Sequence, residues 1–533
     1  MTTQPLAPEH FQIFDTTLRD GAQQEGLRLS VPDKLRIARL LDGLGVAFIE
    51  GGWPGANPND TAFFEAAKAE LELDNARLVA FGSTRKAGGS AASDALTQAL
   101  VDAGTEYICI VAKSHDRHVT DALRTTLEEN LAMVHDTVTH LVGLGKHVFV
   151  DCEHFFDGYR SNPDYALSIV RTAADAGAEV VVLCDTNGGM LPSQMADVVS
   201  SAAEMGVELG VHCHNDTGCA VANSIAAVEA GVIQVQGTMN GYGERTGNAD
   251  LTSVIPNLQL KYGWPLISDE QLASLSHVAL AIADITNQAP HARQPYVGHS
   301  SFAHKAGLHA SAIRVDPNLY QHVDPALVGN GMRMLISDMS GRANIQIKGE
   351  QLGLDLEDRE VAAQVTDAVK AREALGYSYE AADASFELLV RDQLGVLEFP
   401  FEITSWRATT EHRVGMTEAN DTTSEATVRL VAAGETHSTA GEGNGPVDAL
   451  DNALTRALAA SYPQVKGFRL IDYRVRILET GASTDAITRT LIDFSDGERT
   501  WTTVGVGTNV IESSWEALTD AYLYGLVKDF GRS

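Results

Sequence analysis

Eight short runs of apolar and β-branched residues alternate with helical patterns through the first half of the chain, and this alternation restricts the possible folds. The runs are Gln12–Phe14, Ala47–Glu50, Leu78–Phe81, Tyr107–Val111, Val148–Cys152, Val180–Cys184, Gly210–Cys213 and Ile233–Gln236. Helical patterns lie between them, such as Pro32–Gly45, Thr61–Leu71, Leu123–Gly145 and Ala220–Gly231. Eight strands with helical crossovers predict a closed (β/α)8 barrel, or TIM barrel. A doubly wound open sheet is the alternative, which the eightfold repeat disfavours.

Polar residues follow the predicted strands at the positions where a TIM barrel carries its chemistry, the carboxyl ends. His212 and His214 are two residues apart, so on a strand both side chains point to one face. With Asp20 they form a candidate site for a divalent metal that keeps open positions. Arg19, next to Asp20, could stabilise negative charge on a nearby oxygen. The other polar residues at strand ends are Glu50, Thr84, Lys113, Glu153, Asp185, Thr186 and Asn240.

Two further regions contain weaker candidates. The glycine-rich segment Gly237–Asp250 follows the last predicted strand, where Asn248 could add an oxygen ligand and Glu244 could contact a ligand residue. Glu153 is followed by Phe155 and Phe156, and a carboxyl group in apolar surroundings can have a raised pKa and transfer protons. An ion pair at the rim explains the position of Glu153 equally well.

Composition limits the partners and the compartment. The chain has 533 residues, with 71 acidic and 39 basic residues and a formal net charge of −32. This charge argues against nucleic acids and anionic membranes as partners. No apolar stretch reaches the roughly 18 residues of a membrane-spanning helix. Five cysteines without a CxxC pair, and an N-terminus without signal-peptide features, predict a cytoplasmic protein with reduced thiols.

Three regions are expected from the changes in pattern along the chain. They are a catalytic barrel over residues 1–285, linker subdomains over 286–384 that include a helical, charged connector at Asp355–Glu380, and a C-terminal domain over 385–533. The C-terminal domain is predicted to begin with alternating strands such as Phe386–Val390 and Thr427–Val431.

The C-terminal domain contains an internal repeat. Gly441-x-Gly443 precedes a predicted helix at Val447–Leu454, and Gly505-x-Gly507 precedes another at Val510–Leu518. A duplicated β-rich unit that ends in a helix is typical of a ligand-sensing or dimerising module. The glycines are expected to let backbone amides approach a small ligand closely.

Longer motifs connect these candidates. They are DTTLRDGAQ (Asp15–Gln23), HCHNDTGCAVANSIAAVEAG (His212–Gly231), QVQGTMNGYGERTGNADL (Gln234–Leu251) and SFAHKAGLHASAI (Ser301–Ile313). In these motifs the chain resembles the acyl-CoA-dependent 2-oxo acid aldolases, the family of the 2-isopropylmalate, homocitrate and citramalate synthases. The similarity extends from about Phe11 to Lys528, and the C-terminal part resembles the allosteric domain of this family.

Other stretches are similar to the citramalate synthase branch of the family. They are IEGGWPGANPND (Ile49–Asp60), FGSTRKAG (Phe81–Gly88), DCEHFFDGYRSNPDYA (Asp151–Ala166) and VLCDTNGG (Val182–Gly189). Asp151 departs from the family pattern, which often has another residue type lining the oxo acid pocket there.

The resemblance implies a role for each matching residue. Arg19 would stabilise the enolate or aldol oxyanion, Thr186 would contact the oxo acid carboxylate, and Glu153 would take part in proton transfer. His309 and Tyr320, which would otherwise be taken as surface residues, would complete the site across a homodimer. The implied ligands of a divalent metal (Mg, Mn or Zn) are Asp20, His212, His214 and Asn248, with Glu244 among the catalytic residues.

The implied reaction is a Claisen-type condensation of acetyl-CoA with pyruvate, followed by thioester hydrolysis to (R)-citramalate, on a route to isoleucine. The base is open between Glu153 and a pair formed by His309 and Tyr320 acting through water. Isoleucine, or leucine, is the expected effector of the C-terminal domain. A 2-isopropylmalate synthase is the main alternative. A non-catalytic amino-acid sensor is disfavoured because Arg19 and the metal-ligand residues are all present.

Overall fold

The structure is a computed structural model that describes residues 10–336, 342–354, 356, 358–413, 421–478 and 487–530. The expected absence of a targeting signal concerns residues 1–9, which lie outside the described residues. The chain forms two compact units, which we call the barrel unit (Met1–Phe302 and Val323–Gly331) and the C-terminal unit (Ala303–His322 and Met332–Ser533). The chain therefore passes three times from one unit to the other, and the predicted linker region, 286–384, is divided between them.

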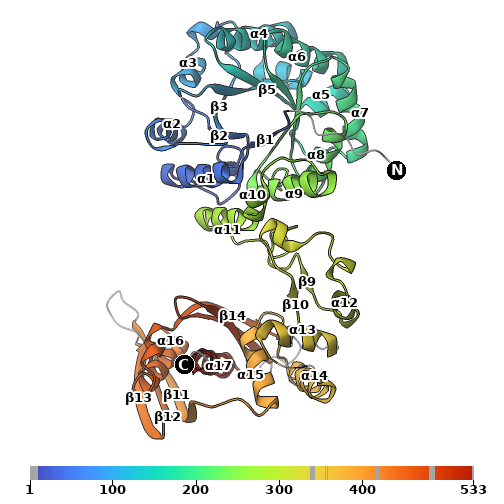
Figure 1. Cartoon of the computed structure of the whole chain (residues 1–533). Coiled ribbons are helices and arrows are strands. Elements are labelled where there is room, and N and C mark those ends of the chain that lie inside the picture. The colour runs from blue at the N-terminus through green and yellow to red at the C-terminus, as the bar shows by residue number, and fades with distance from the viewer. Residues whose placement is uncertain are drawn as a thin grey trace. The chain divides into compact units, whose positions relative to one another are not determined.

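The barrel unit contains eight parallel strands, each paired with its neighbours in sequence, and β1 closes the barrel against β8 (Figure 1). The strands are β1 (Gln12–Asp15), β2 (Phe48–Gly52), β3 (Arg77–Ser83), β4 (Tyr107–Lys113), β5 (His147–Glu153), β6 (Val180–Asp185), β7 (Leu209–Cys213) and β8 (Gln234–Gly237). All eight predicted strands and the TIM barrel are confirmed.

Helices surround the barrel strands (Figure 1). They are α1 (Val31–Leu44), α2 (Pro58–Glu70), α3 (Ala95–Asp102), α4 (Leu127–Gly143), α5 (Phe155–Ser161), α6 (Pro163–Asp175), α7 (Pro192–Ala203), α8 (Ala220–Glu229), α9 (Leu251–Pro256), α10 (Asp269–Ala273) and α11 (Leu275–Thr286). Local signals define their ends. Helix α1, for example, begins with a capping box between Ser30 and Asp33 and ends at Gly45, whose φ of 92° favours glycine.

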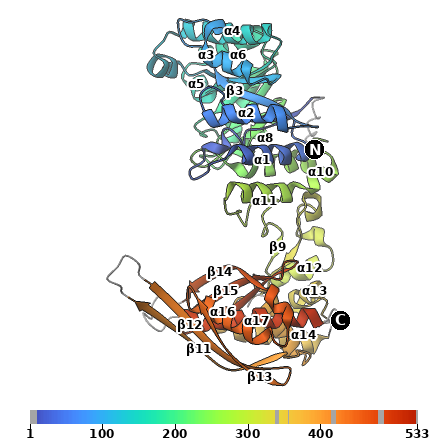
Figure 2. The same cartoon turned by 90° about the vertical axis from the view of Figure 1, so that its left-hand side faces the viewer.

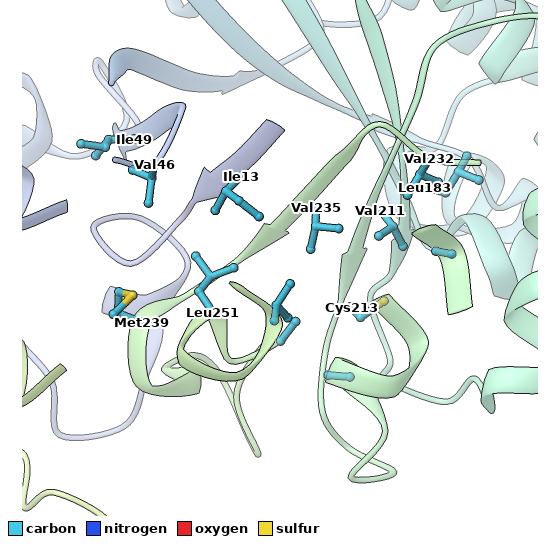
Figure 3. Packing of buried hydrophobic residues seen from close by; sticks show 14 of the residues in the cluster. Ile13, Val46, Ile49, Leu183, Val211, Cys213, Val232, Val235, Met239 and Leu251 are labelled. Carbon is cyan, nitrogen blue, oxygen red and sulfur yellow. The ribbon is translucent and has the colours of Figure 1, made fainter. Parts of the chain in front are cut away.

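Successive side chains of the barrel strands point alternately outward and inward, and this produces two apolar layers. Ile13, Val211 and Val235 point outward into the layer between strands and helices (Figure 3). Inside the barrel, Phe149 packs against Phe14 and Phe48, with ring centroids 5.8 and 5.0 Å apart. Polar side chains at the rim therefore stand on a rigid, closely packed support.

The C-terminal unit contains two antiparallel three-stranded sheets, and each sheet is followed by a helix (Figure 2). The first repeat is β11 (Phe401–Arg413), β12 (Asp421–Ala432), β13 (Glu435–Gly443) and α16 (Pro446–Leu458). The second is β14 (Arg469–Ile477), β15 (Thr488–Ser495), β16 (Thr500–Gly507) and α17 (Val510–Phe530). The two repeats share one core, and Tyr522 of α17 donates a hydrogen bond to Asp451 of α16 at 2.7 Å. The predicted duplicated module is confirmed.

Shorter elements precede these repeats in the C-terminal unit. They are β9 (Ala303–His304), α12 (Gly307–Ile313), β10 (Arg333–Met334), α13 (Arg342–Leu352), α14 (Arg359–Ala374) and α15 (Asp383–Gln393). Val365 of α14, Phe386 of α15 and Val504 of β16 belong to the same buried cluster. The connector helices and the last strand therefore form one core. No helix in the described ranges combines the length and apolar content that a membrane span requires.

The predicted strand Phe386–Val390 is wrong, because these residues lie within helix α15. Phe386 and Val390 belong to one buried cluster, whereas Ala384 and Leu388 belong to another. The helix therefore buries two faces, each with a spacing of four residues. Two interleaved helical spacings produced the alternating pattern that resembled a strand.

The structure gives the repeat glycines a packing role, because their own helices occupy the space where a side chain would stand, and their expected role in ligand binding stays a prediction. A methyl group on Gly441 would lie 2.4 Å from the backbone nitrogen of Ala453 in α16. A methyl group on Gly505 would lie 2.1 Å from the carbonyl oxygen of Ser513 in α17. These glycines allow each helix to pack directly on its strand.

Candidate active site

The loop after β1 positions Arg19 and Asp20. Thr17 donates from its backbone N–H and its hydroxyl to the two carboxylate oxygens of Asp15, each at 2.8 Å. The N–H of Met239, in the loop after β8, donates in turn to the hydroxyl of Thr17 at 2.9 Å. Burial raises the pKa of Asp15 to about 7, despite these hydrogen bonds. The loop is thus fixed to the carboxyl ends of both the first and the last barrel strand.

Asp20, His212 and His214 lie together and are buried. Asp20 Oδ2 lies 3.1 Å from His212 Nε2 and 3.7 Å from His214 Nε2. His212 is on β7 and His214 follows it, so the spacing of two residues does place both imidazoles beside one carboxylate.

Asn248 lies beside this cluster through the backbone bridge between His214 and Asn248. Its Nδ2 donates to the carbonyl oxygen of Tyr242 at 3.0 Å, whereas its Oδ1 is buried and has no hydrogen-bond partner. A methyl group on Gly243 would lie 2.3 Å from Asn248 Nδ2, so this turn requires glycine. A buried oxygen without a partner, two imidazoles and a carboxylate are a donor set that suits a divalent metal.

The charges in the cluster depend strongly on one another. Burial by itself would raise the pKa of Asp20, but Arg19 and the two histidines hold it well below its usual value. Burial, together with the neighbouring His212, lowers the pKa of His214 to about 4. Burial would also lower the pKa of His212, but its hydrogen bond to Asp20 raises it. His214 is consequently a neutral ligand-type imidazole, as metal binding requires.

Arg19 is held rigidly above the barrel interior. Its Nε donates to Glu50 Oε2 at 2.5 Å, and its guanidinium carbon lies 3.8 Å from the ring centroid of Phe81. Burial would lower the pKa of Arg19, but Glu50, Asp20 and Asp151 raise it, so the side chain is a permanent cation. Burial raises the pKa of Glu50 to about 7 although Arg19 opposes the change.

Glu153 and Thr186 lie at the neighbouring part of the rim. Glu153 ends β5, its side chain is 25% exposed, and it forms an ion pair with Lys113. The hydroxyl of Thr186 accepts a hydrogen bond from the backbone N–H of His154 at 2.8 Å. The ion pair that the sequence left open for Glu153 is therefore present, and it places a lysine beside the carboxylate.

Three other predicted residues have separate surroundings within their own units. Glu244 is exposed and pairs with Arg245 at 3.6 Å. His309 and Tyr320 belong to the C-terminal unit, where their ring centroids are 4.2 Å apart. The structure thus brings Arg19, Asp20 and the two histidines together with Asn248, and it places Glu244 in solvent.

A polar group beneath the metal-ligand residues was not identified from the sequence. Asp151 and Gln236 are buried inside the barrel, and Gln236 Nε2 donates to Asp151 Oδ1 at 3.0 Å. Burial raises the pKa of Asp151, and the charges of His212 and Arg19 oppose this rise. The period of two in Gln234-Val235-Gln236 already indicates that both glutamines face away from the helices.

Known family models and relatives match nearly the whole length of the chain. Residues 10–279 match the HMGL-like family model, residues 296–375 the model of the homocitrate synthase post-HMGL domain, and residues 380–526 the LeuA allosteric (dimerisation) domain. The chain is 59% identical to the (R)-citramalate synthase of Streptomyces coelicolor over 99% of each chain. It is 47% identical to that of Synechocystis over 96% of each chain.

The chain belongs to the (R)-citramalate synthase family. A probable 2-isopropylmalate synthase from Methanopyrus kandleri is 32% identical over 96% of this chain and 97% of its own. The lower identity confirms the predicted placement in the citramalate synthase branch. Membership in the (R)-citramalate synthase family makes the chain an enzyme and excludes the non-catalytic sensor.

Proposed function

We propose that this enzyme condenses acetyl-CoA with pyruvate and hydrolyses the product thioester, giving (R)-citramalate and CoA. The observation that supports this proposal best is the group formed by Arg19, Asp20, His212 and His214 at one place on the barrel rim, in a chain so similar to (R)-citramalate synthases. When the keto carbon of an oxo acid is attacked, negative charge develops on the keto oxygen. The positive charges of Arg19 and of a bound metal would stabilise it.

Asp20, His212, His214 and Asn248 would hold a divalent metal, which supplies Lewis-acid polarisation of the oxo acid when bound. Arg19 keeps its charge at every working pH and is oriented by Glu50 and Phe81. It stabilises the oxyanion that develops as the keto group is attacked. The hydroxyl of Thr186 orients the carboxylate of pyruvate.

Besides the metal and Arg19, the condensation requires a base and a proton donor. A base takes a proton from the methyl group of acetyl-CoA, and that carbon forms a bond to C2 of pyruvate. The keto oxygen becomes a hydroxyl by taking a proton, and water then cleaves the C–S bond to give a carboxylate and the CoA thiol. Glu153, beside Lys113, and the pair of His309 and Tyr320 are the two candidates for the base.

The C-terminal unit would bind isoleucine, with leucine as the alternative, and would hold a homodimer together. The match of residues 380–526 to an allosteric dimerisation domain supports this part of the proposal.

The test is an assay of free thiol release with acetyl-CoA and a panel of 2-oxo acids, on enzyme supplied with Mg²⁺ or Mn²⁺. We expect pyruvate to exceed 3-methyl-2-oxobutanoate in kcat/KM, by roughly 10- to 200-fold for a pocket that discriminates by methyl groups. Pyruvate-dependent thiol release must also yield citramalate, identified by chiral chromatography. A preference for the branched acid would assign the enzyme to leucine biosynthesis instead.

A further inference from the structure

We propose that Gln236, oriented by Asp151, is a positioning residue that fixes the tautomer of His212 so that the lone pair of Nε2 faces the metal position. The inference rests on the proposed metal site and adds a hydrogen-bonded chain beneath it. None of the motifs above assigned a role to Gln236.

The chain of contacts runs through the buried interior of the barrel. Asp151 on β5 accepts from Gln236 Nε2 on β8 at 3.0 Å. Gln236 Oε1 lies 2.9 Å from His212 Nδ1 on β7, and His212 Nε2 lies 3.1 Å from Asp20 Oδ2. All four residues are less than 5% exposed, so water does not compete for these contacts.

Whether each group donates or accepts a hydrogen bond determines the role of the next group in the chain. A carboxylate only accepts hydrogen bonds, so Asp151 attracts the NH₂ end of the Gln236 amide. The carbonyl end of the amide then faces His212, and this oxygen requires a proton on Nδ1. In the neutral imidazole Nε2 is left with its lone pair, which is what a metal ligand needs.

Gln234 provides a matched comparison. It lies on β8 two residues before Gln236, it is equally buried, and its Nε2 donates to Gln12 Oε1 at 2.8 Å. It therefore shares the strand, the side-chain type and the burial of Gln236, but its partner, Gln12, is not a residue of the metal site. Replacing either glutamine with leucine removes a buried amide from the same strand.

The experiment compares Gln236→Leu, Gln236→Glu and Gln234→Leu in the full chain. The affinity for Mn²⁺ is measured from the electron paramagnetic resonance signal of the free ion, without substrates. Gln236→Leu should weaken Mn²⁺ binding about 10- to 100-fold, the usual effect of losing a partner of a metal-ligating histidine. Gln236→Glu keeps an oxygen acceptor for Nδ1–H, and since two buried carboxyl groups in contact cannot both ionise, one of the pair keeps a proton that can bridge to the other. It should therefore bind Mn²⁺ more tightly than Gln236→Leu. Gln234→Leu should stay within about twofold of the unchanged protein, since it leaves that partner in place.

A second measurement reads the tautomer directly. The protein saturated with Mg²⁺ and labelled with ¹⁵N-histidine is compared with His212→Asn to identify the signals of His212 by their loss. The proton on Nδ1 should exchange slowly with solvent in the unchanged protein, and it should exchange faster in Gln236→Leu, which lacks the buried acceptor.

The outcomes separate the two proposals. If the unchanged protein binds no Mn²⁺, the proposed metal site is wrong, and the positioning role fails with it, whatever the tautomer. If it binds Mn²⁺ but Gln236→Leu binds equally well, only the positioning role is wrong. A His212 Nδ1 that carries no proton in the Mg²⁺-bound protein would also overturn the inference. Equal melting temperatures of Gln236→Leu and Gln234→Leu confirm that both variants are folded to the same extent.

Discussion

The carboxylate of Asp20 lies within 4 Å of Arg19 and of both histidines, His212 and His214. We expect Asp20→Ala to lose metal affinity and to lower kcat by roughly 100-fold or more, since even partners outside the ligand set usually contribute 10- to 100-fold. Mn²⁺ binding and thiol release measure the two effects, and circular dichroism checks that the barrel persists. A variant that keeps full activity with no bound metal would contradict the assignment.

Arg19 is the second residue whose contacts predict a measurable effect. Arg19→Lys keeps the charge but loses both the directed hydrogen bond to Glu50 and the stacking on Phe81. We expect kcat/KM for pyruvate to fall about 100- to 1000-fold, the range found when one oxyanion donor is removed. Arg28→Lys, on the exposed part of the same loop, is the control. Similar losses in both variants would show that the loop, and not the guanidinium, causes the effect.

Asp520 in α17 predicts a dependence of stability on pH. Burial raises its pKa from 3.8 to about 7, although Ser385 donates a hydrogen bond to it at 3.0 Å. The folded state therefore binds this proton more tightly than the unfolded state, and the contribution of Asp520 to stability falls as the pH rises from about 4 through about 7. Asp520→Asn cannot ionise, so it should raise the melting temperature at pH 8 more than at pH 5.

The exposed Asp392 supplies the control for this measurement. Asp392→Asn should change the melting temperature little and equally at both pH values. If Asp520→Asn behaves in the same way, the carboxyl group of Asp520 is not destabilised by ionisation in the folded protein.

At the scale of elements, the contact of each repeat helix with its strand depends on glycine. Gly505→Ala would place a methyl group 2.1 Å from the Ser513 carbonyl oxygen, so α17 must shift. We expect destabilisation of about 1–3 kcal/mol or more, as for other overpacked sites. Urea unfolding, followed by the fluorescence of Trp501 and Trp515, measures it. Gly467→Ala, where the nearest atom is 4.0 Å away, should cost much less, and equal costs would refute the packing explanation.

The sequence predicted the strands well where one periodicity dominates and failed where two overlap. Some barrel strands, such as β6 (Val180–Asp185), bury both faces, so their apolar runs are nearly continuous and their positions are clear. In α15, two helical faces bury different residues in different cores, and together they imitate alternation. The close packing at Gly441 and Gly505 could not be read from the sequence, because glycine signals close approach without identifying what approaches.

The site was predictable to the extent that its residues lie in contiguous motifs. Arg19, Asp20, His212 and His214 were identified because each pair is close in sequence. The link from Asp151 through Gln236 to His212 joins three strands, and such a contact depends on the register between them. For that reason it became visible only in the folded barrel.

At the scale of the whole molecule, the C-terminal unit predicts a regulatory response. Isoleucine should inhibit thiol release, with a coupling free energy of about 1–3 kcal/mol. Coupling in binding is reciprocal, so saturating pyruvate should weaken isoleucine binding by the same factor by which isoleucine weakens pyruvate binding. Calorimetry of the full chain with and without pyruvate measures this factor. If isoleucine, leucine and valine all fail to bind, the unit is structural only.

The path of the chain also restricts how this enzyme can exchange parts with its relatives. Because the polypeptide enters the C-terminal unit at Ala303, returns at Val323 and leaves again after Gly331, a hybrid gene with a single crossover between Ala303 and Met332 mixes segments of both units from two parents. A crossover near Glu380 divides the core that joins α14 and α15 to Val504. Recombination that preserves both units must transfer Ala303–His322 together with everything from Met332 onward, so the C-terminal unit is inherited as two separate pieces of sequence.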